Sequence, residues 1–80
     1  MGDVVLIGSR HSADTLRLQE FLEHNGHPFT HFELGQDAPA EQLLQRFNLR
    51  PEDVPVLIGR DQSPMRNPTN VELAARLGCG

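Results

Sequence analysis

The chain has 80 residues, enough for one small domain with a single core, and its net charge is −4. Its seven basic residues are all arginines scattered singly, which excludes the basic stripe that a nucleic-acid partner needs. No apolar run approaches the roughly 20 residues that cross a bilayer, the first residues lack the layout of a signal peptide, and a single cysteine cannot form an internal disulfide. A cytoplasmic location without membrane contact is therefore expected.

The first half of the chain predicts two strands and two helices. An apolar run predicts a strand over 3–8, and Ser12 then precedes a helix over about 13–25, because a serine hydroxyl at the cap position accepts a hydrogen bond from a free backbone N–H. Gly26 is expected to end this helix in the left-handed conformation. The expected buried stripe of the helix is Leu18, Phe21 and Leu22, extended to one side by Leu16.

Alternation over 29–34 predicts a second strand, and a second helix is expected from Asp37 or Ala38, with Pro39 in its first turn. The 3.6-residue period of that helix gives an apolar face of Ala40, Leu43, Leu44 and Phe47.

The second half predicts a hairpin followed by a last helix. A connection over 48–53 leads to a strand that opens at Pro55, where the missing N–H of proline costs no ladder bond. A loop over 60–63 and a short edge strand over 64–66 follow, and the turn over 67–70 also caps the last helix. That helix is expected over about 71–77, with Leu73, Ala74 and Leu77 facing inward.

The element order is therefore β-α-β-α-β-β-α, an α/β class. The first βαβ unit requires a parallel strand pair, whereas the closing hairpin adds an antiparallel edge. The two continuously apolar runs, over 4–8 and 54–59, predict neighbouring central strands that are covered on both faces. We expect a four-stranded mixed sheet flanked by three helices.

This order, together with Val54-Pro55 at the opening of the third strand, resembles the thioredoxin fold in its short glutaredoxin form. The resemblance covers nearly the whole chain, so residues 1–80 are interpreted as a single glutaredoxin-like domain. It implies a cis peptide bond between Val54 and Pro55, beside the position of the glutaredoxin active site.

The chain departs from glutaredoxins at the active-site motif. Ser12 and Thr15 occupy the positions of the two cysteines in Cys-x-x-Cys. A helix N-terminus lowers the pKa of a thiol enough to make thiolate abundant, but a serine hydroxyl is far less acidic and needs a base to become a nucleophile. Thiol–disulfide exchange is therefore excluded at Ser12.

Four stretches together resemble a more specific glutaredoxin-like module, which is found in bacterial proteins fused to a thioredoxin-reductase-like FAD/NAD(P) domain, often behind a cyclic-nucleotide-binding or receiver domain. These stretches are 7–12, 25–29, 53–57 and 67–74. The resemblance implies that the natural chain continues past Gly80. It also implies a redox-inactive docking or regulatory domain, monomeric when isolated and without a cofactor of its own, whose flavin partner lies in the same chain or in a separate one. The expected contact surface lies around Ser12, Val54, Pro55 and Asn67.

Glutathione binding is the alternative function. In glutaredoxins the backbone beside the cis-proline pairs with glutathione, and the turn that matches Asn67, Thr69 and Asn70 holds one of its carboxylates. Pro68 removes one N–H donor from that turn. A serine-type glutathione transferase would use Ser12 to activate the thiol, but that family completes its substrate site with a helical domain that this sequence lacks.

The histidines and the single cysteine are not expected to have a catalytic or metal-binding role. His11 is interpreted as a solvated loop residue, although it could act as a base for its neighbour Ser12. The spacing of His24, His27 and His31 is not a metal-ligand pattern, so no metal is expected. Cys79 is interpreted as an exposed thiol, with a thiol reductase acting through it as the minor alternative.

Overall fold

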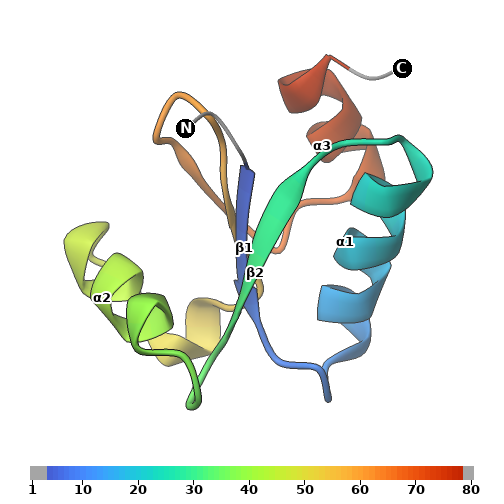
Figure 1. The fold of residues 1–80 in the computed structure, drawn as a ribbon. Helices are drawn as coiled ribbons and strands as arrows, with labels where there is room; N and C mark the ends of the chain where they lie inside the picture. Colours follow the sequence, from blue (N-terminus) through green and yellow to red (C-terminus); the bar gives the residue numbers. More distant parts are fainter. Residues whose placement is uncertain (1–3, 79–80) are drawn as a thin grey trace.

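Four strands and three α-helices make up residues 4–78, the part of the chain that the computed structural model describes (Figure 1). The strands are β1 (Val4–Gly8), β2 (Phe29–Glu33), β3 (Val56–Ile58) and β4 (Pro64–Arg66). The helices are α1 (Ala13–His24), α2 (Ala38–Arg46) and α3 (Asn70–Leu77), with a short 3-10 turn, η1 (Pro51–Asp53), before β3. The predicted order β-α-β-α-β-β-α is confirmed.

The strands form one mixed sheet in the order β2-β1-β3-β4. β1 is parallel to β2, with Val4 opposite Phe29, and antiparallel to β3, with Leu6 opposite Leu57. β4 pairs antiparallel with β3 at the edge. The two apolar runs are therefore the central neighbours, as the sequence predicted.

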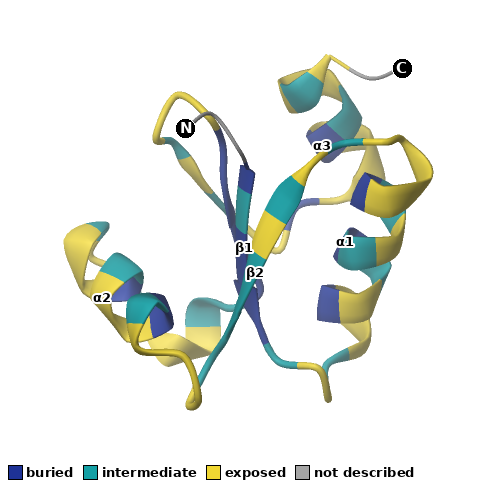
Figure 2. Ribbon diagram, in the orientation of Figure 1, coloured by how far each residue is buried: buried dark blue, intermediate teal, exposed yellow. Residues whose placement is uncertain are grey.

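Helices cover both faces of this sheet, α1 and α3 on one side and α2 on the other (Figure 1). Successive residues of β1 point to opposite faces, so the sheet separates two apolar clusters. The buried members of the α1–α3 cluster are Val4, Leu6, Leu18, Leu22, Leu57 and Leu73. Those of the α2 cluster are Ile7, Ala40, Leu44, Val56 and Ile58. β1 and β3 are accordingly the most buried of the described elements (Figure 2).

The start and the end of α1 follow local signals, but its buried face differs from the prediction. Ser12 is the N-cap, and Gly26, just past the end, has a φ of 65°. Leu16 was expected to extend the buried stripe, and this is wrong: the residue is 45% exposed. Thr15, fully buried, takes that place because it lies three residues before Leu18 and thus on the same side of the helix.

Smaller differences concern element ends. The second strand stops at Glu33 rather than at residue 34, and Phe47 lies at the C-cap of α2 while it still packs in the α2 cluster. α3 begins at Asn70, one residue earlier than expected, because Thr69 is its N-cap. The 3-10 turn over 51–53 was not anticipated.

The peptide bond between Val54 and Pro55 is cis, and β3 begins at the next residue, Val56. The predictions that concern Asp3 and Cys79 lie outside the described residues. Within residues 4–78, no helix has the length and the apolar content that crossing a lipid bilayer requires.

Candidate functional site

Ser12 and Thr15, the two hydroxyl residues that the sequence analysis singled out, lie at the N-cap and in the first turn of α1. The Ser12 hydroxyl accepts a hydrogen bond from the Thr15 backbone N–H at 3.3 Å, which confirms its role as a helix cap. Within the described chain no side-chain base is hydrogen-bonded to Ser12, and His11 is an exposed loop residue. The arrangement therefore does not activate Ser12 as a nucleophile.

Thr15 is used inside the protein. Its side chain is fully buried, and its Oγ1 accepts a hydrogen bond from the Ser9 backbone N–H at 3.2 Å. Gly8 leaves the space for it, because a Cβ at that position would lie 2.4 Å from Thr15 Oγ1. Of these two hydroxyls, only that of Ser12 belongs to a partly exposed residue.

A carboxylate from β2 holds the loop that leads into α1. Both oxygens of Glu33 accept the Arg10 backbone N–H, at 3.1 and 3.0 Å. Beside it, the Gln19 side-chain amide nitrogen lies 2.8 Å from His31 Nδ1, and the His31 Nε2 lies 3.5 Å from a Glu33 oxygen. This polar set fixes α1 and its preceding loop on the end of β2.

The cis-proline segment meets the turn that precedes α3. The Pro55 carbonyl accepts a hydrogen bond from the Asn67 backbone N–H at 2.7 Å, and Asn67 has a positive φ of 41°. Val54 is half-buried in the α2 cluster, and its N–H makes a long bond of 3.3 Å to the Pro51 carbonyl. Pro55 and Asn67, both predicted site residues, are therefore in direct contact.

Arg17 joins α1 to this same turn, and the sequence analysis did not identify it. Its guanidinium donates to Asn70 Oδ1 at 2.6 Å, and to Asn67 Oδ1 and the Pro68 carbonyl, both at 3.0 Å. The Arg17 Nε lies 3.6 Å from Asp14 Oδ1, and the Asn67 side-chain amide donates to the other Asp14 oxygen at 3.2 Å. We call Asp14, Arg17, Asn67, Pro68 and Asn70 the Arg17 clamp.

The N-terminus of α3 is occupied by the chain's own acidic side chain. Thr69 Oγ1 accepts the Glu72 backbone N–H at 3.1 Å, and Glu72 Oε1 accepts the Thr69 N–H at 2.8 Å, a capping box. The Thr-x-x-Glu spacing is visible in the sequence but was overlooked. A ligand carboxylate here would meet the Glu72 carboxylate, a turn without the Pro68 N–H, and an Asn70 side chain already bonded to Arg17.

The other two histidines of the predicted group, His24 and His27, do not form a cluster with His31. His24 is exposed at the end of α1, and His27 is half-buried beside the β3–β4 loop, in a hollow that it shares with Gly59 and Asp61. Among residues 4–78, no three His, Cys, Asp or Glu side chains come together in a way that could hold a metal ion.

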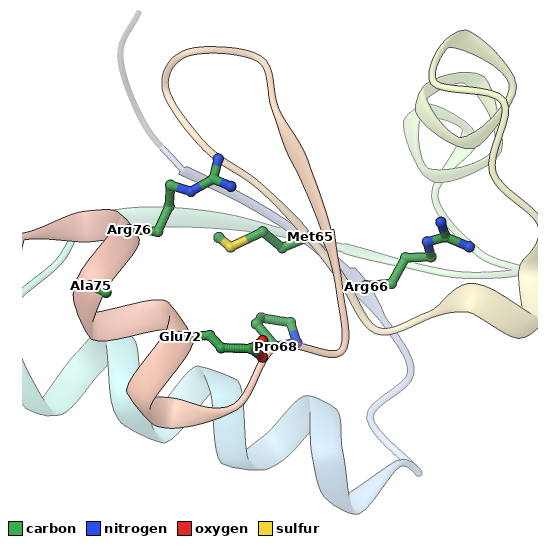
Figure 3. Close-up of a pocket in the computed structure, with 6 residues that line it drawn as sticks. All are labelled: Met65, Arg66, Pro68, Glu72, Ala75 and Arg76. Carbon is green, nitrogen blue, oxygen red and sulfur yellow. The ribbon is translucent and has the colours of Figure 1, made fainter.

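A cavity of about 580 Å³ lies next to the Arg17 clamp, between β4 and α3 (Figure 3). Pro68 is part of its wall and also part of the clamp. Its lining residues are Met65, Arg66, Pro68, Glu72, Ala75 and Arg76.

Comparison with known proteins identifies the fold. No family model matches the sequence, and no curated protein is significantly similar to it. Among solved structures, a mutant of the thioredoxin-like protein BC3987 superposes with a TM-score of 0.84 over 100% of both chains, at 18% sequence identity. Residues 4–78 therefore have a thioredoxin-like fold.

Proposed function

We propose that this domain is a non-catalytic docking or regulatory module of a thioredoxin-reductase-like flavin oxidoreductase, whose own domain holds FAD and NAD(P). The observation that carries the proposal is the first turn of α1. The strands and helices of the thioredoxin-like fold are all present. In the first turn of α1, however, the Ser12 hydroxyl caps the helix and the Thr15 hydroxyl is buried against Gly8. A scaffold that retains the shape of a disulfide substrate without its thiols is suited to binding a reductase and not to exchanging electrons with it.

The proposed contact surface lies around Ser12, Val54, Pro55 and Asn67. The Arg17 clamp and the bond between Asn67 and Pro55 hold parts of this surface in one arrangement before any partner arrives. A surface that is ordered in advance loses less conformational entropy on binding. This preorganisation supports recognition of a protein partner.

The experiment that tests the proposal restores the missing thiols. The double variant Ser12→Cys, Thr15→Cys, oxidised to a disulfide, is offered to a thioredoxin-reductase-like flavoprotein with NADPH, and NADPH oxidation is followed. We expect the double variant to be reduced, because its thiol at position 12 lies at a helix N-terminus on the proposed docking surface. The wild-type domain should support no turnover but should inhibit competitively, because it occupies the same surface.

Surface variants of the wild-type inhibitor locate the contact. Ser12→Ala and Asn67→Ala should weaken inhibition, whereas Arg46→Ala on α2, on the other side of the sheet, should not. A wild-type domain that fails to inhibit reduction of the double variant contradicts the docking function. Equal inhibition by all three variants would leave the docking but contradict the proposed surface.

The glutathione alternative is less well supported by the geometry. The α3 N-terminus, which would receive a glutathione carboxylate, already binds Glu72, and the negative charge of that side chain opposes a second carboxylate. An amide NMR titration with reduced glutathione separates the two functions. Saturable shifts at Ser12, Thr15, Val54 and residues 67–70 would favour glutathione binding, and their absence would favour the protein partner.

A further inference from the structure

β4 is the last strand of the sheet formed by residues 4–78, and one of its edges faces away from β3. Two bonds fix which backbone groups face which way: the Gly59 N–H donates to the Ser63 carbonyl at 3.1 Å, and the Asn67 N–H donates to the Pro55 carbonyl at 2.7 Å. Bonded pairs alternate along an antiparallel ladder. Pro64 and Arg66 therefore direct their backbone polar groups outward.

This outer edge offers three hydrogen-bonding groups. They are the Arg66 N–H, the Arg66 carbonyl and the Pro64 carbonyl, because proline has no N–H to contribute. Unpaired groups on an edge strand are a template on which an extended segment can add a further strand.

The side chains of β4 lie on two different faces. Met65 packs against the α1–α3 cluster and extends into the cavity between β4 and α3, whereas the Arg66 guanidinium points away from Met65 (Figure 3). The Arg66 Nη1 lies 3.7 Å from Asp53 Oδ1. Pro68 and Ala75 complete the apolar part of the cavity wall. The open edge and the cavity thus adjoin on the α3 side.

Opposite charges mark the two ends of this cavity. Near the hairpin loop, the Arg76 guanidinium donates to the Ser63 hydroxyl and lies 3.9 Å from Asp61, which leaves donors on its other nitrogens. Near the turn before α3, Glu72 accepts the Thr69 N–H with Oε1, and no donor among the described residues is bonded to its second oxygen.

We propose that the β4 edge and this cavity form a docking site for an extended partner segment that pairs antiparallel with β4. The segment carries a basic, an apolar and an acidic side chain at alternate positions, in that order from its N-terminus. The residue opposite Met65 places its apolar side chain in the cavity. The residue two positions later lies opposite Ser63 and meets Arg76, and the residue two positions earlier lies opposite Asn67 and meets Glu72.

Glu72 and Arg76 are separated by about 6 Å along α3, whereas the segment residues opposite Ser63 and Asn67 lie four positions apart on the strand, about 13 Å. The two side chains bridge this difference because they reach different points of the chain beside β4: Arg76 is hydrogen-bonded to Ser63, and Glu72 to the Thr69 N–H. Antiparallel pairing with β4 of a second copy does not supply these charges, because Ser63 and Asn67 at its two flanking positions are uncharged. The site adjoins the contact surface proposed above at Asn67, but it rests on the β4 edge, Glu72 and Arg76, so it does not depend on that function.

Two capped peptides of identical composition test the proposal by amide NMR titration. The first, Thr-Thr-Lys-Thr-Val-Thr-Glu-Thr-Thr, has the proposed order, and the second exchanges its lysine and glutamate. We expect the first peptide to shift the amides of Met65, Arg66, Ala75 and Arg76, to slow hydrogen exchange at Arg66, and to bind about fivefold more tightly than the second, as expected from two exposed charge pairs with α3.

Variants of the domain assign the preference to the two charged side chains. The double variant Glu72→Arg, Arg76→Glu should bind the second peptide more tightly than the first. Arg76→Glu alone leaves the Thr69–Glu72 capping box intact and should abolish the preference for the first peptide, so it serves as the test if the double variant does not fold. Arg46→Ala on α2 is the matched control, because it also removes one positive charge but lies on the other side of the sheet; its preference for the first peptide should not change.

Three results would overturn the proposal. They are equal affinity for the two peptides, tighter binding of the second peptide by the wild-type domain, and no saturable shift on β4 or α3 at about 5 mM peptide, a concentration at which even millimolar binding is visible.

Discussion

The close contact between Gly8 and Thr15 joins the end of β1 to the first turn of α1. A Cβ on residue 8 would lie 2.4 Å from Thr15 Oγ1 and 2.7 Å from its Cγ2, both well inside van der Waals contact. Both residues are buried, so neither can move into open space. Residue 8 must be glycine because the Thr15 side chain lies too close to leave room for a Cβ.

We therefore expect Gly8→Ala to lower the free energy of unfolding by about 1–3 kcal/mol, the usual cost of overpacking a core. In a Thr15→Ala background the added cost should be smaller, because the two closest atoms are gone. A double-mutant cycle in urea measures this coupling. Leu16→Ala, at an exposed position of the same turn, should cost little, and strictly additive effects at residues 8 and 15 would contradict the contact.

Asp61 in the hairpin loop has a lowered pKa, chiefly because the Ser63 hydroxyl donates to its carboxylate, with smaller contributions from the Ser63 backbone and from Arg76. A carboxyl whose pKa is lower in the folded state stabilises the fold above its unfolded pKa of about 3.8, and this stabilisation disappears as the pH falls through the folded value. Asp61→Asn should therefore be less stable than the wild type near neutral pH, with the difference shrinking below about pH 3.8. Urea denaturation over a pH series checks this, and a pH-independent difference would exclude the carboxylate as its source.

Among the elements, α1 and α3 are linked by a single guanidinium. Arg17 donates hydrogen bonds to three acceptors around the turn before α3, which lies about 50 positions later in the chain. The planar guanidinium can bond several acceptors at once, whereas a lysine ammonium is a compact point charge on a flexible stem. The orientation of the turn over 67–70 thus depends on the geometry of this side chain as well as on its charge.

Arg17→Lys should consequently behave much like Arg17→Ala. We expect each to lower the free energy of unfolding by about 1 kcal/mol, since the bonds are partly exposed, and to speed hydrogen exchange at the start of α3. Arg60→Ala, on the hairpin loop, is the control and should change neither quantity. Full retention of stability by Arg17→Lys would show that charge alone is sufficient.

The elements themselves were predicted from the sequence where a local signal marks them. Ser12 at a cap, Gly26 after a helix and Pro55 before a strand act on neighbouring residues only, so their effects can be derived without the fold. Arg17 and Glu33 are different, because their partners are distant in sequence and become neighbours only when the sheet forms. The candidate site remains a prediction for the same reason: the residues that hold it together carry no local signature.

In the molecule as a whole, one sheet separates two apolar clusters that share β1 and β3. The clusters lie on opposite faces, and side chains from α1 and α3 fill one while those from α2 fill the other. Because the backbone of the sheet lies between them, a cavity made in one cluster has no direct route by which the other could fill it.

Leu22→Ala should cost about 2–5 kcal/mol in the α1–α3 cluster, and Ile58→Val about 0.5–1.5 kcal/mol in the α2 cluster. We expect the double variant to show the sum of the two effects to within about 0.5 kcal/mol. Urea denaturation of the four proteins gives the result. A coupling well above that limit would mean that the sheet transmits packing changes between its faces.

Because β1 is buried on both faces, the pattern of its apolar residues specifies its pairing register only weakly. In a sheet with one wet face, sliding a strand by one residue exposes its apolar side chains, and this penalty selects the correct pairing. β1 carries apolar residues on both sides, so that penalty is weak here. A slide by one position would, however, bring Ile7 or Ser9 to the place of Gly8, where Thr15 leaves no room for a side chain. The contact between Gly8 and Thr15 thus helps to fix the pairing register of β1.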